Sequence, residues 1–346
     1  MQTKPKIWKE LRHQQAQYRA TMKKRKKAAK QKRHNHIHER KIDRYSLQKA
    51  IHAQPSIMTA PSNFSFVDNT NEMIGYINSC KDALHKNKKI KIDISKIEHL
   101  SPDAITLLVA NVNDKKFSGK YGQIEGNAPE CKDLAKLFVE SGFYQYVKPE
   151  SRVLQSAKNE KENLLHRESH VKVEPNLAAK ACRLGMRHVM EDKYRVPELY
   201  EMLVEAMSNT NNHANKQEVG TTKWWLYTYN APEGITCYSF IDLGVGIFDS
   251  LPVARYKRIT NFLRITHNAD LVPDLLDGKI KSSEKIDQEV RGKGIPQIAN
   301  NSQIKNFGRA YIISNNVKID LKTRTAERLE YDFKGTFLYW ELINPK

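Results

Sequence analysis

The stretch LVEAMSNTNNHAN, residues 203–215, decides how the second half of the chain is interpreted. Its apolar residues recur at helical spacing, and Glu205 and Asn209 stand one turn apart. Asn212 and His213 follow at i+7 and i+8, so all four share one edge of the helix. A carboxylate at such an edge can polarise a water molecule, and an amide oxygen one turn further can complete a Mg²⁺ shell beside phosphate oxygens. A solvated stripe at a helix end has the same pattern, so the neighbouring motifs must discriminate between the two interpretations.

Three glycine-containing motifs follow this helix along the chain. The sequence DLGVG at residues 242–246 ends an apolar strand, where a carboxylate can accept from an exocyclic amine and glycines let the backbone approach a flat base. RGKG at residues 291–294 precedes a short helix, whose free amide groups and dipole favour phosphate. GTF at residues 335–337 opens the last strand with a hydroxyl that can reach a phosphate. Each motif alone is also typical of an ordinary turn or strand beginning.

Taken together and in this order, the four motifs resemble those of the Bergerat-fold (GHKL) ATPases, the superfamily of gyrase and the sensor histidine kinases. The resemblance covers residues 176–346, and the form EAMSNTNNHA is most similar to the anti-sigma-factor serine kinases. It implies a two-layer α/β sandwich that binds ATP with Mg²⁺, in which Glu205 is the catalytic residue and Asn209 the metal ligand. It also implies a nucleotide-binding set: Asn209, Asn212, His213, Asp242, Gly244, Gly246, Arg291, Gly292, Lys293, Gly294 and Thr336.

The chain departs from this family in the region that would form the lid over ATP. The second glycine motif is shorter than the family's GxGxG, and residues 248–290 form a long basic insertion, so the resemblance assigns no contacts to the lid. A GxxxxGK[ST] motif does not occur in the sequence, which excludes a P-loop.

Residues 62–150 predict a small α/β domain, because strands and helices alternate there with short loops. The run KIKIDISKIEHLSPDAITLLV, residues 89–109, resembles the strand, loop and helix start of STAS domains, the fold of anti-sigma-factor antagonists. Asp103 stands where that family has its acceptor serine. It either caps the helix that Pro102 starts or imitates a permanent negative charge. Ser101 remains a candidate phosphate acceptor.

The net charge of +19 is distributed unevenly over the 346 residues. Residues 1–45 hold 16 basic and 3 acidic residues, which gives this head a net charge of +13. We expect residues 1–53 to form a basic arm, either a solvated helix or a disordered segment, that can bind a polyanion. Pro55 and Pro61 predict a linker after the arm, and the polar residues 151–175 predict a second linker before the domain at 176–346.

Cysteine spacing and hydropathy restrict the class of protein further. The four cysteines include no Cys-x-x-Cys pair, which argues against a disulfide framework or a zinc ribbon and favours a reducing cytoplasm. The longest nearly apolar stretch, residues 104–112, is shorter than the ~20 residues that span a bilayer. Cysteine spacing and hydropathy therefore predict a cytoplasmic protein that does not enter membranes, and the two resemblances imply a bacterial regulatory protein.

The two resemblances together imply an ATP-binding regulatory protein, in which an ATPase domain that uses Mg²⁺ and ATP is coupled to a STAS-like domain. Two alternatives stay open: a protein serine kinase of the anti-sigma-factor type, and an ATP-gated switch with little turnover that binds a protein or a nucleic acid. The expected partners are ATP, a protein bound through the STAS-like domain, a nucleic acid bound through the basic arm, and a second copy of the chain.

Overall fold

The computed structural model describes residues 54–86, 88–118, 122–147, 164–168, 173–213, 224–251, 267–280 and 294–345. For residues 164–168 and 211–213 it describes the backbone alone. Of the basic arm it describes five lysines, which are helical and exposed: Lys23, Lys24, Lys26, Lys27 and Lys30. The remainder of the arm, and the prediction that it binds a polyanion, lie outside the described residues. The described parts contain both helices and strands, which confirms the α/β class.

Residues 54–147, called the N-terminal unit below, form a small α/β structure around a parallel sheet of order β1-β3-β5. A short parallel ladder pairs β2 with β4. The strands are β1 (Ser56–Thr59), β2 (Asn63–Phe64), β3 (Lys89–Asp93), β4 (His99–Leu100) and β5 (Gln123–Gly126). The helices are α2 (Thr70–His85), α3 (Pro102–Val112), α4 (Lys115–Ser118), α5 (Lys132–Glu140) and the 3₁₀ turn η1 (Phe143–Gln145).

Strand β1 lies within the segment between residues 53 and 62 that the sequence predicts to be a linker. It pairs with β3 from Ser56 opposite Ile90 to Thr59 opposite Asp93. Pro55 and Pro61 flank the strand rather than interrupt it. Prolines at the ends of a strand at the edge of a sheet remove no ladder hydrogen bond, so they do not exclude a strand here.

Residues 164–345, the C-terminal unit, contain an antiparallel five-stranded sheet of order β6-β7-β8-β10-β9. Its strands are β6 (Leu164–Glu168), β7 (Trp224–Ala231), β8 (Ile235–Asp242), β9 (Phe307–Asp320) and β10 (Thr325–Leu342). Strand β6 falls in the second predicted linker, where its five residues stand among polar neighbours and give little strand signal. The segments RAYIIS and VKID lie in one continuous strand, β9, although the polar residues between them would favour two separate strands.

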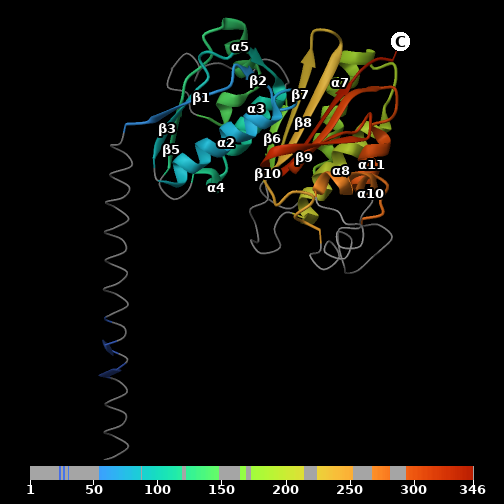
Figure 1. Cartoon of the computed structure of the whole chain (residues 1–346). Coiled ribbons are helices and arrows are strands. Elements are labelled where there is room, and N and C mark those ends of the chain that lie inside the picture. The colour runs from blue at the N-terminus through green and yellow to red at the C-terminus, as the bar shows by residue number, and fades with distance from the viewer. Residues whose placement is uncertain are drawn as a thin grey trace, which may run out of the picture.

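One face of this large sheet is covered by helices of the C-terminal unit (Figure 1). Trp224 and Leu226 of β7 and Phe240 of β8 point toward them and are buried. The helices are α7 (Pro175–Met190), α8 (Pro197–His213), α10 (Val272–Leu276), α11 (Gly294–Asn301) and the 3₁₀ turn η2 (Asn268–Leu271). The sheet and these helices make the two expected layers.

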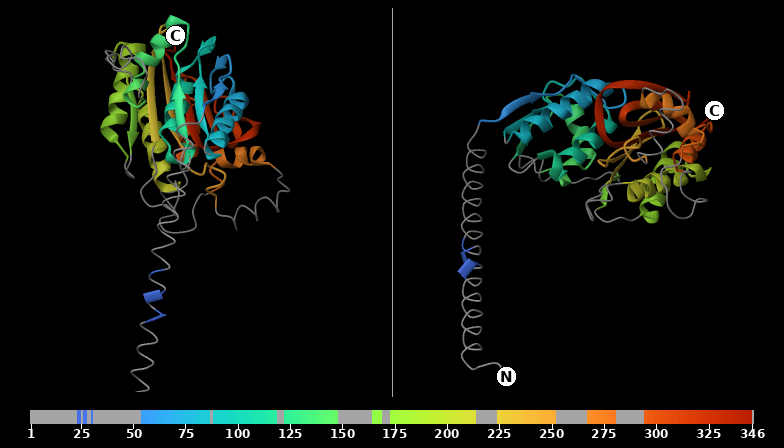
Figure 2. Two further views of the ribbon diagram at one scale, coloured as in Figure 1. Left: turned by 90° about the vertical axis from the view of Figure 1, so that its left-hand side faces the viewer. Right: turned by 60° about the horizontal axis from the view of Figure 1, so that its bottom comes forward.

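The opposite face of the large sheet is buried beneath the N-terminal unit. Trp225 and Tyr227 alternate with the helix-facing residues of β7 and belong to the same apolar core as the N-terminal unit. Helix α3 packs on β7 and β8, and α2 packs on β10. Figure 2 shows the blue and cyan elements lying along the yellow and red strands in both views. The apolar run WWLYTY therefore belongs to the core, and it is nearly continuous because its strand is buried on both faces.

Among the described residues, no helix combines the length and the apolar composition needed to cross a bilayer.

Candidate functional site

Helix α8 brings Glu205 and Asn209 against the beginning of α11. A Cβ atom added to Gly294 would lie 2.7 Å from Asn209 Oδ1 and 2.9 Å from Glu205 Oε2, too close for any larger residue without a shift of these groups. Glycine therefore lets the first turn of α11 approach both side chains. The first amide groups of a helix have no acceptor within the helix, so this turn presents free N–H donors beside a carboxylate and an amide.

A second carboxylate on α8 holds α11 in this position. Glu201 Oε2 accepts a hydrogen bond of 3.0 Å from Gln297 Nε2 and another of 3.0 Å from Asn301 Nδ2. Gln297 and Asn301 are one turn apart on the same face of α11. These bonds join the two helices one turn before Glu205.

Asp242 is the last residue of β8, and its side chain is buried among hydrogen-bond donors. Its Oδ1 accepts from the Gly244 amide at 2.9 Å, and Thr210 Oγ1 donates to Oδ2 at 3.5 Å. Thr336, directly opposite Asp242 in the β8–β10 pairing, adds a side-chain hydrogen bond. Because Thr210 follows Asn209 in α8, the contact between Thr210 and Asp242 joins the two halves of the site.

The sequence prediction assigned the Thr336 hydroxyl to a phosphate, and that role stays a prediction. In the structure this hydroxyl supports the carboxylate of Asp242, because the register of β10 against β8 places the two side chains opposite each other. Thr336 thus belongs to the Asp242 half of the site.

Burial changes the acidity of both carboxyl groups in this region. It raises the pKa of Asp242 from 3.8 to about 6, and the bonds from Gly244, Thr210 and Thr336 oppose the rise. The pKa of Glu205 is also raised, first by burial and then by the negative charge of Glu201. A carboxylate with a raised pKa is a stronger base, which suits Glu205 to proton abstraction near neutral pH.

Asn209 has the properties needed to contact a bound ion or ligand. Its Nδ2 atom is buried and has no hydrogen-bond partner among the described residues, a state that costs ~1–3 kcal/mol for a buried donor. Its Oδ1 atom is an oxygen of the kind that Mg²⁺ accepts. In the described parts of the chain there is no cluster of three His, Cys, Asp or Glu side chains suited to a metal.

Two neighbouring residues of β9, which sequence reasoning missed, hold the loop that contains Gly244 and Gly246. Ser314 Oγ accepts from the Ile247 amide at 2.8 Å, and Asn315 Oδ1 accepts from the Phe248 amide at 3.1 Å. Gly246 has φ +86°, and its α-carbon abuts the Asn315 side chain. The sequence carries a signal for them, because SNN interrupts an apolar strand with residues that strands disfavour.

The other predicted site residues are only partly described. Asn212 and His213 lie in the last turn of α8, with the backbone alone described. Arg291, Gly292 and Lys293 lie outside the described residues. The structure thus brings together Glu205, Asn209, Asp242, Gly244, Gly294 and Thr336, and Gly246 lies in the loop that follows Asp242.

The interpretation of Asp103 as a helix cap is wrong. Ser101 occupies the N-cap position of α3, and no side-chain hydrogen bond caps the helix. Instead, Asp103 Oδ2 accepts from the backbone amides of Phe66 at 2.6 Å and Val67 at 2.7 Å. The Ser101 hydroxyl donates to the other carboxylate oxygen. Asp103 is therefore a buried residue that fixes a loop, and burial raises its pKa.

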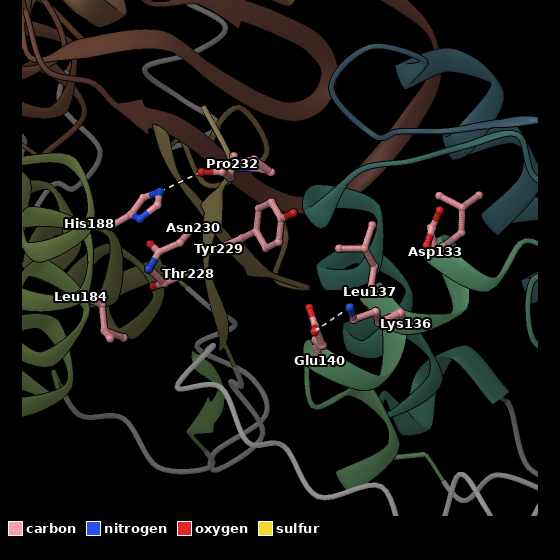
Figure 3. Close-up of a pocket in the computed structure, with 12 residues that line it drawn as sticks. Asp133, Lys136, Leu137, Glu140, Leu184, His188, Thr228, Tyr229, Asn230 and Pro232 are labelled. Atoms are coloured by element: carbon pink, nitrogen blue, oxygen red, sulfur yellow. Dashed lines mark hydrogen bonds and ion pairs between the residues drawn. The ribbon is translucent and has the colours of Figure 1, made fainter. Parts of the chain in front are cut away.

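A separate pocket of about 740 Å³ lies between α5 and the end of β7 beside α7 (Figure 3). His188 Nε2 is 2.7 Å from the Ala231 carbonyl at one side, and Lys136 is 4.0 Å from Glu140 at the other. None of the predicted site residues lines this pocket. It is distinct from the arrangement around Asp242.

Neither protein-family models nor curated proteins give a match for this chain. A functional conclusion must therefore come from the arrangement of the residues. That arrangement combines a carboxyl group of raised pKa, an unsatisfied amide, the start of a helix and a buried hydrogen-bond acceptor. Groups of these kinds can bind a phosphorylated ligand with a polar ring.

Proposed function

We propose that the C-terminal unit is a Bergerat-type domain that binds ATP with Mg²⁺ and hydrolyses it, and that the N-terminal unit is a STAS-like regulatory domain coupled to it. The main support for the proposal is that residues from separate sequence motifs lie near one another in the fold. Glu205, Asn209, Asp242, Gly294 and Thr336 come from four motifs spread between residues 205 and 336. Gly294 approaches Glu205 and Asn209, and Asp242 contacts both Thr336 and Thr210, the residue after Asn209, which supports one shared site. Unrelated turns and strand ends have no reason to converge in this way.

Each group has a role that follows from its chemistry. The Asp242 carboxylate accepts a hydrogen bond from the exocyclic amine of adenine, and Gly244 and Gly246 leave room for the ring. The Asn209 Oδ1 atom binds Mg²⁺, which when bound neutralises charge on the phosphates. Glu205 orients and deprotonates the attacking water molecule, while the amides at the start of α11 stabilise phosphate charge.

One experiment separates this proposal from its two alternatives. The full chain is incubated with γ-labelled ATP and Mg²⁺, and free phosphate is separated from labelled protein. Release of free phosphate supports hydrolysis, label on protein supports the serine kinase, and binding without either product supports the ATP-gated switch. Failure to bind ATP would overturn all three.

A matched pair of variants controls this experiment for contaminating activity. Glu205→Gln removes the base, whereas Glu198→Gln makes the same change two turns earlier on α8. Only Glu205→Gln should abolish formation of free phosphate or labelled protein. Equal product from both variants would assign the activity to another residue or another protein.

The remaining functional expectations stay predictions. They are a protein partner for the STAS-like unit, a nucleic acid for the basic arm, a second copy of the chain and a cytoplasmic location.

A further inference from the structure

The loop formed by residues 65–68 is fixed within the N-terminal unit by one buried carboxylate. Asp103 Oδ2 accepts the amides of Phe66 and Val67, and the Ser65 hydroxyl approaches it at 3.4 Å. A carboxylate that accepts several backbone donors holds them firmly, because each bond is charge-assisted. The loop therefore has a single defined position relative to α3.

The same loop is also tied to the large sheet from the other side. Lys318 Nζ of β9 donates to the Val67 carbonyl at 2.7 Å, and Arg309 of β9 forms an ion pair of 2.8 Å with Asp68. Arg309 Nε in turn contacts Glu341 Oε1 of β10 at 2.9 Å. These bonds connect the loop to both strands at one edge of the sheet.

Phe66 is the residue of this loop that enters the shared core. Its ring is fully buried and meets two rings of β10 edge to face, with centroids 5.3 Å from Phe333 and 4.8 Å from Phe337. Such pairs have preferred geometries and transmit a displacement of one ring to the other. Phe333 and Phe337 are consequently held in place by a side chain of the N-terminal unit.

The backbone between Phe333 and Phe337 bulges out of the sheet and ends at the Asp242 site. Phe333 is opposite Asn315 and Thr336 is opposite Ser314, so Lys334 and Gly335 have no partner on β9. Gly335, at φ +142°, abuts the Asp242 carbonyl, and its own carbonyl accepts from Ser314 Oγ at 2.8 Å. Thr336, the next residue, makes the side-chain bond to Asp242.

We propose that Phe66, held by Asp103, is a positioning residue for the nucleotide site. It fixes the bulge that carries Thr336 and so determines the place of the carboxylate of Asp242. This inference rests on the proposed function, and it makes the N-terminal unit a determinant of adenine affinity. The phosphate end of the site, formed by α8 and α11, does not depend on Phe66.

The test compares Phe66→Leu with Phe64→Leu in the full chain. Both phenylalanines are fully buried in the same core, but the aromatic partner of Phe64 is Tyr76 of α2 and not a ring of β10. We expect Phe66→Leu to raise the dissociation constant for Mg²⁺-ATP about fivefold or more, and Phe64→Leu to change it less than about twofold. Binding of Mg²⁺-tripolyphosphate, which has no adenine, should be the same in both. Equal ATP affinities in the two variants would overturn the proposal.

A second readout needs no nucleotide and separates failure of this inference from failure of the proposed function. The pKa of Asp242 is followed by carbon NMR, with Thr336→Val as the reference for loss of the threonine bond. Because that bond lowers the pKa, Phe66→Leu should raise it in the direction of Thr336→Val, and Phe64→Leu should not. If the natural chain fails to bind ATP, the proposed function fails, and this pKa response alone then decides whether Phe66 positions Thr336.

A further variant tests the same role with a smaller change to the core, in case Phe66→Leu unfolds the protein. Asp103→Asn keeps an acceptor for the loop amides but removes its charge, so it should weaken ATP binding in the same direction and by less. Unchanged ATP affinity and an unchanged Asp242 pKa in this folded variant would overturn the role given to Asp103.

Discussion

Asp242 combines a buried carboxylate, three hydrogen bonds to it and a raised pKa in one side chain. Such a group can serve as an acceptor for adenine only while it is ionised. Its protonation therefore links nucleotide binding to pH, and its burial links folding to pH. Both consequences can be worked out from the direction of the pKa change.

The free energy of unfolding should fall as pH rises from about 4 to about 6, by an amount on the order of 3 kcal/mol from this residue. The Asp242 carboxyl group has a higher pKa in the folded state than in the unfolded state, so the folded protein binds an extra proton in this interval. The stabilisation from that proton is complete below pH 3.8 and lost above about pH 6. ATP affinity should change oppositely and rise through about pH 6. Denaturant unfolding and calorimetric titration measure the two effects.

Asp242→Asn is the variant that checks this assignment. It cannot ionise, so the part of both pH dependences that Asp242 contributes should be lost, and ATP should bind more weakly because a neutral acceptor is weaker. Asp133→Asn, a substitution at an exposed residue outside the site, should keep both pH dependences. Persistence of the same pH profile in Asp242→Asn would assign the titration to another group.

Glu205→Ala should retain ATP binding and lose turnover by about 100-fold or more, because it removes a group needed mainly in the transition state. The measurement pairs a binding isotherm with the rate of phosphate release. Glu198→Ala on the same helix serves as the control. A full rate in Glu205→Ala would place the base elsewhere.

At the scale of elements, the contact of α11 with α8 depends on the absence of a side chain at Gly294. Gly294→Ala would place a methyl group within 3.0 Å of polar atoms of Asn209 and Glu205. We expect α11 to shift and Mg²⁺-ATP affinity to fall about tenfold, with a small change in melting temperature. Gly126→Ala on β5 is the matched control, because a methyl group there meets neighbours only at 3.5 Å or more. Equal affinity in both variants would remove Gly294 from the site.

Elements with a strong local signal could be predicted from the sequence. Pro102 marks the beginning of α3, and the spacing of polar residues in α8 places Glu205 and Asn209 on one edge of a helix. Strands β1 and β6 could not be predicted, since each is short and is specified by its partner strand rather than by its own residues. The sequence SNN marks Ser314 and Asn315 as unusual in a strand, but their hydrogen bonds to the amides of Ile247 and Phe248 appear only in the folded structure.

At the scale of the whole molecule, one apolar core belongs to both units. Residues of the large sheet such as Trp225, Tyr227 and Phe337 are buried by the N-terminal unit, and each contributes about 1.5–3 kcal/mol. If the two units were separated, the combined loss of free energy from burial of these side chains would be comparable to the ~5–15 kcal/mol that stabilises a typical domain.

A chain of residues 164–346 alone should therefore bind a hydrophobic dye or aggregate, whereas residues 51–346 should melt like the full chain. Dye fluorescence and thermal melting distinguish the two outcomes. A well-folded, ATP-binding fragment of residues 164–346 would show that the shared core is dispensable.

Deletion of residues 1–50 tests the basic arm separately. It should leave ATP binding nearly unchanged and abolish a salt-sensitive affinity for nucleic acid, since several phosphate contacts lose affinity steeply between about 50 and 200 mM salt. A shift assay at both salt concentrations, with and without ATP, measures this. Equal binding by the two proteins would move the nucleic-acid site to the body of the molecule.

The position of β10 between β8 and β9 also determines when this protein can mature on a ribosome. The N-terminal unit emerges first, and its Phe66 has no partner until Phe333 and Phe337 have been synthesised. Strand β9 likewise cannot join the sheet before its neighbour arrives. The part of the core that Phe66 shares with the sheet therefore stays incomplete until strand β10, which runs from Thr325 to Leu342, has been synthesised. Cotranslational chaperones would find their longest-lived target in that interval.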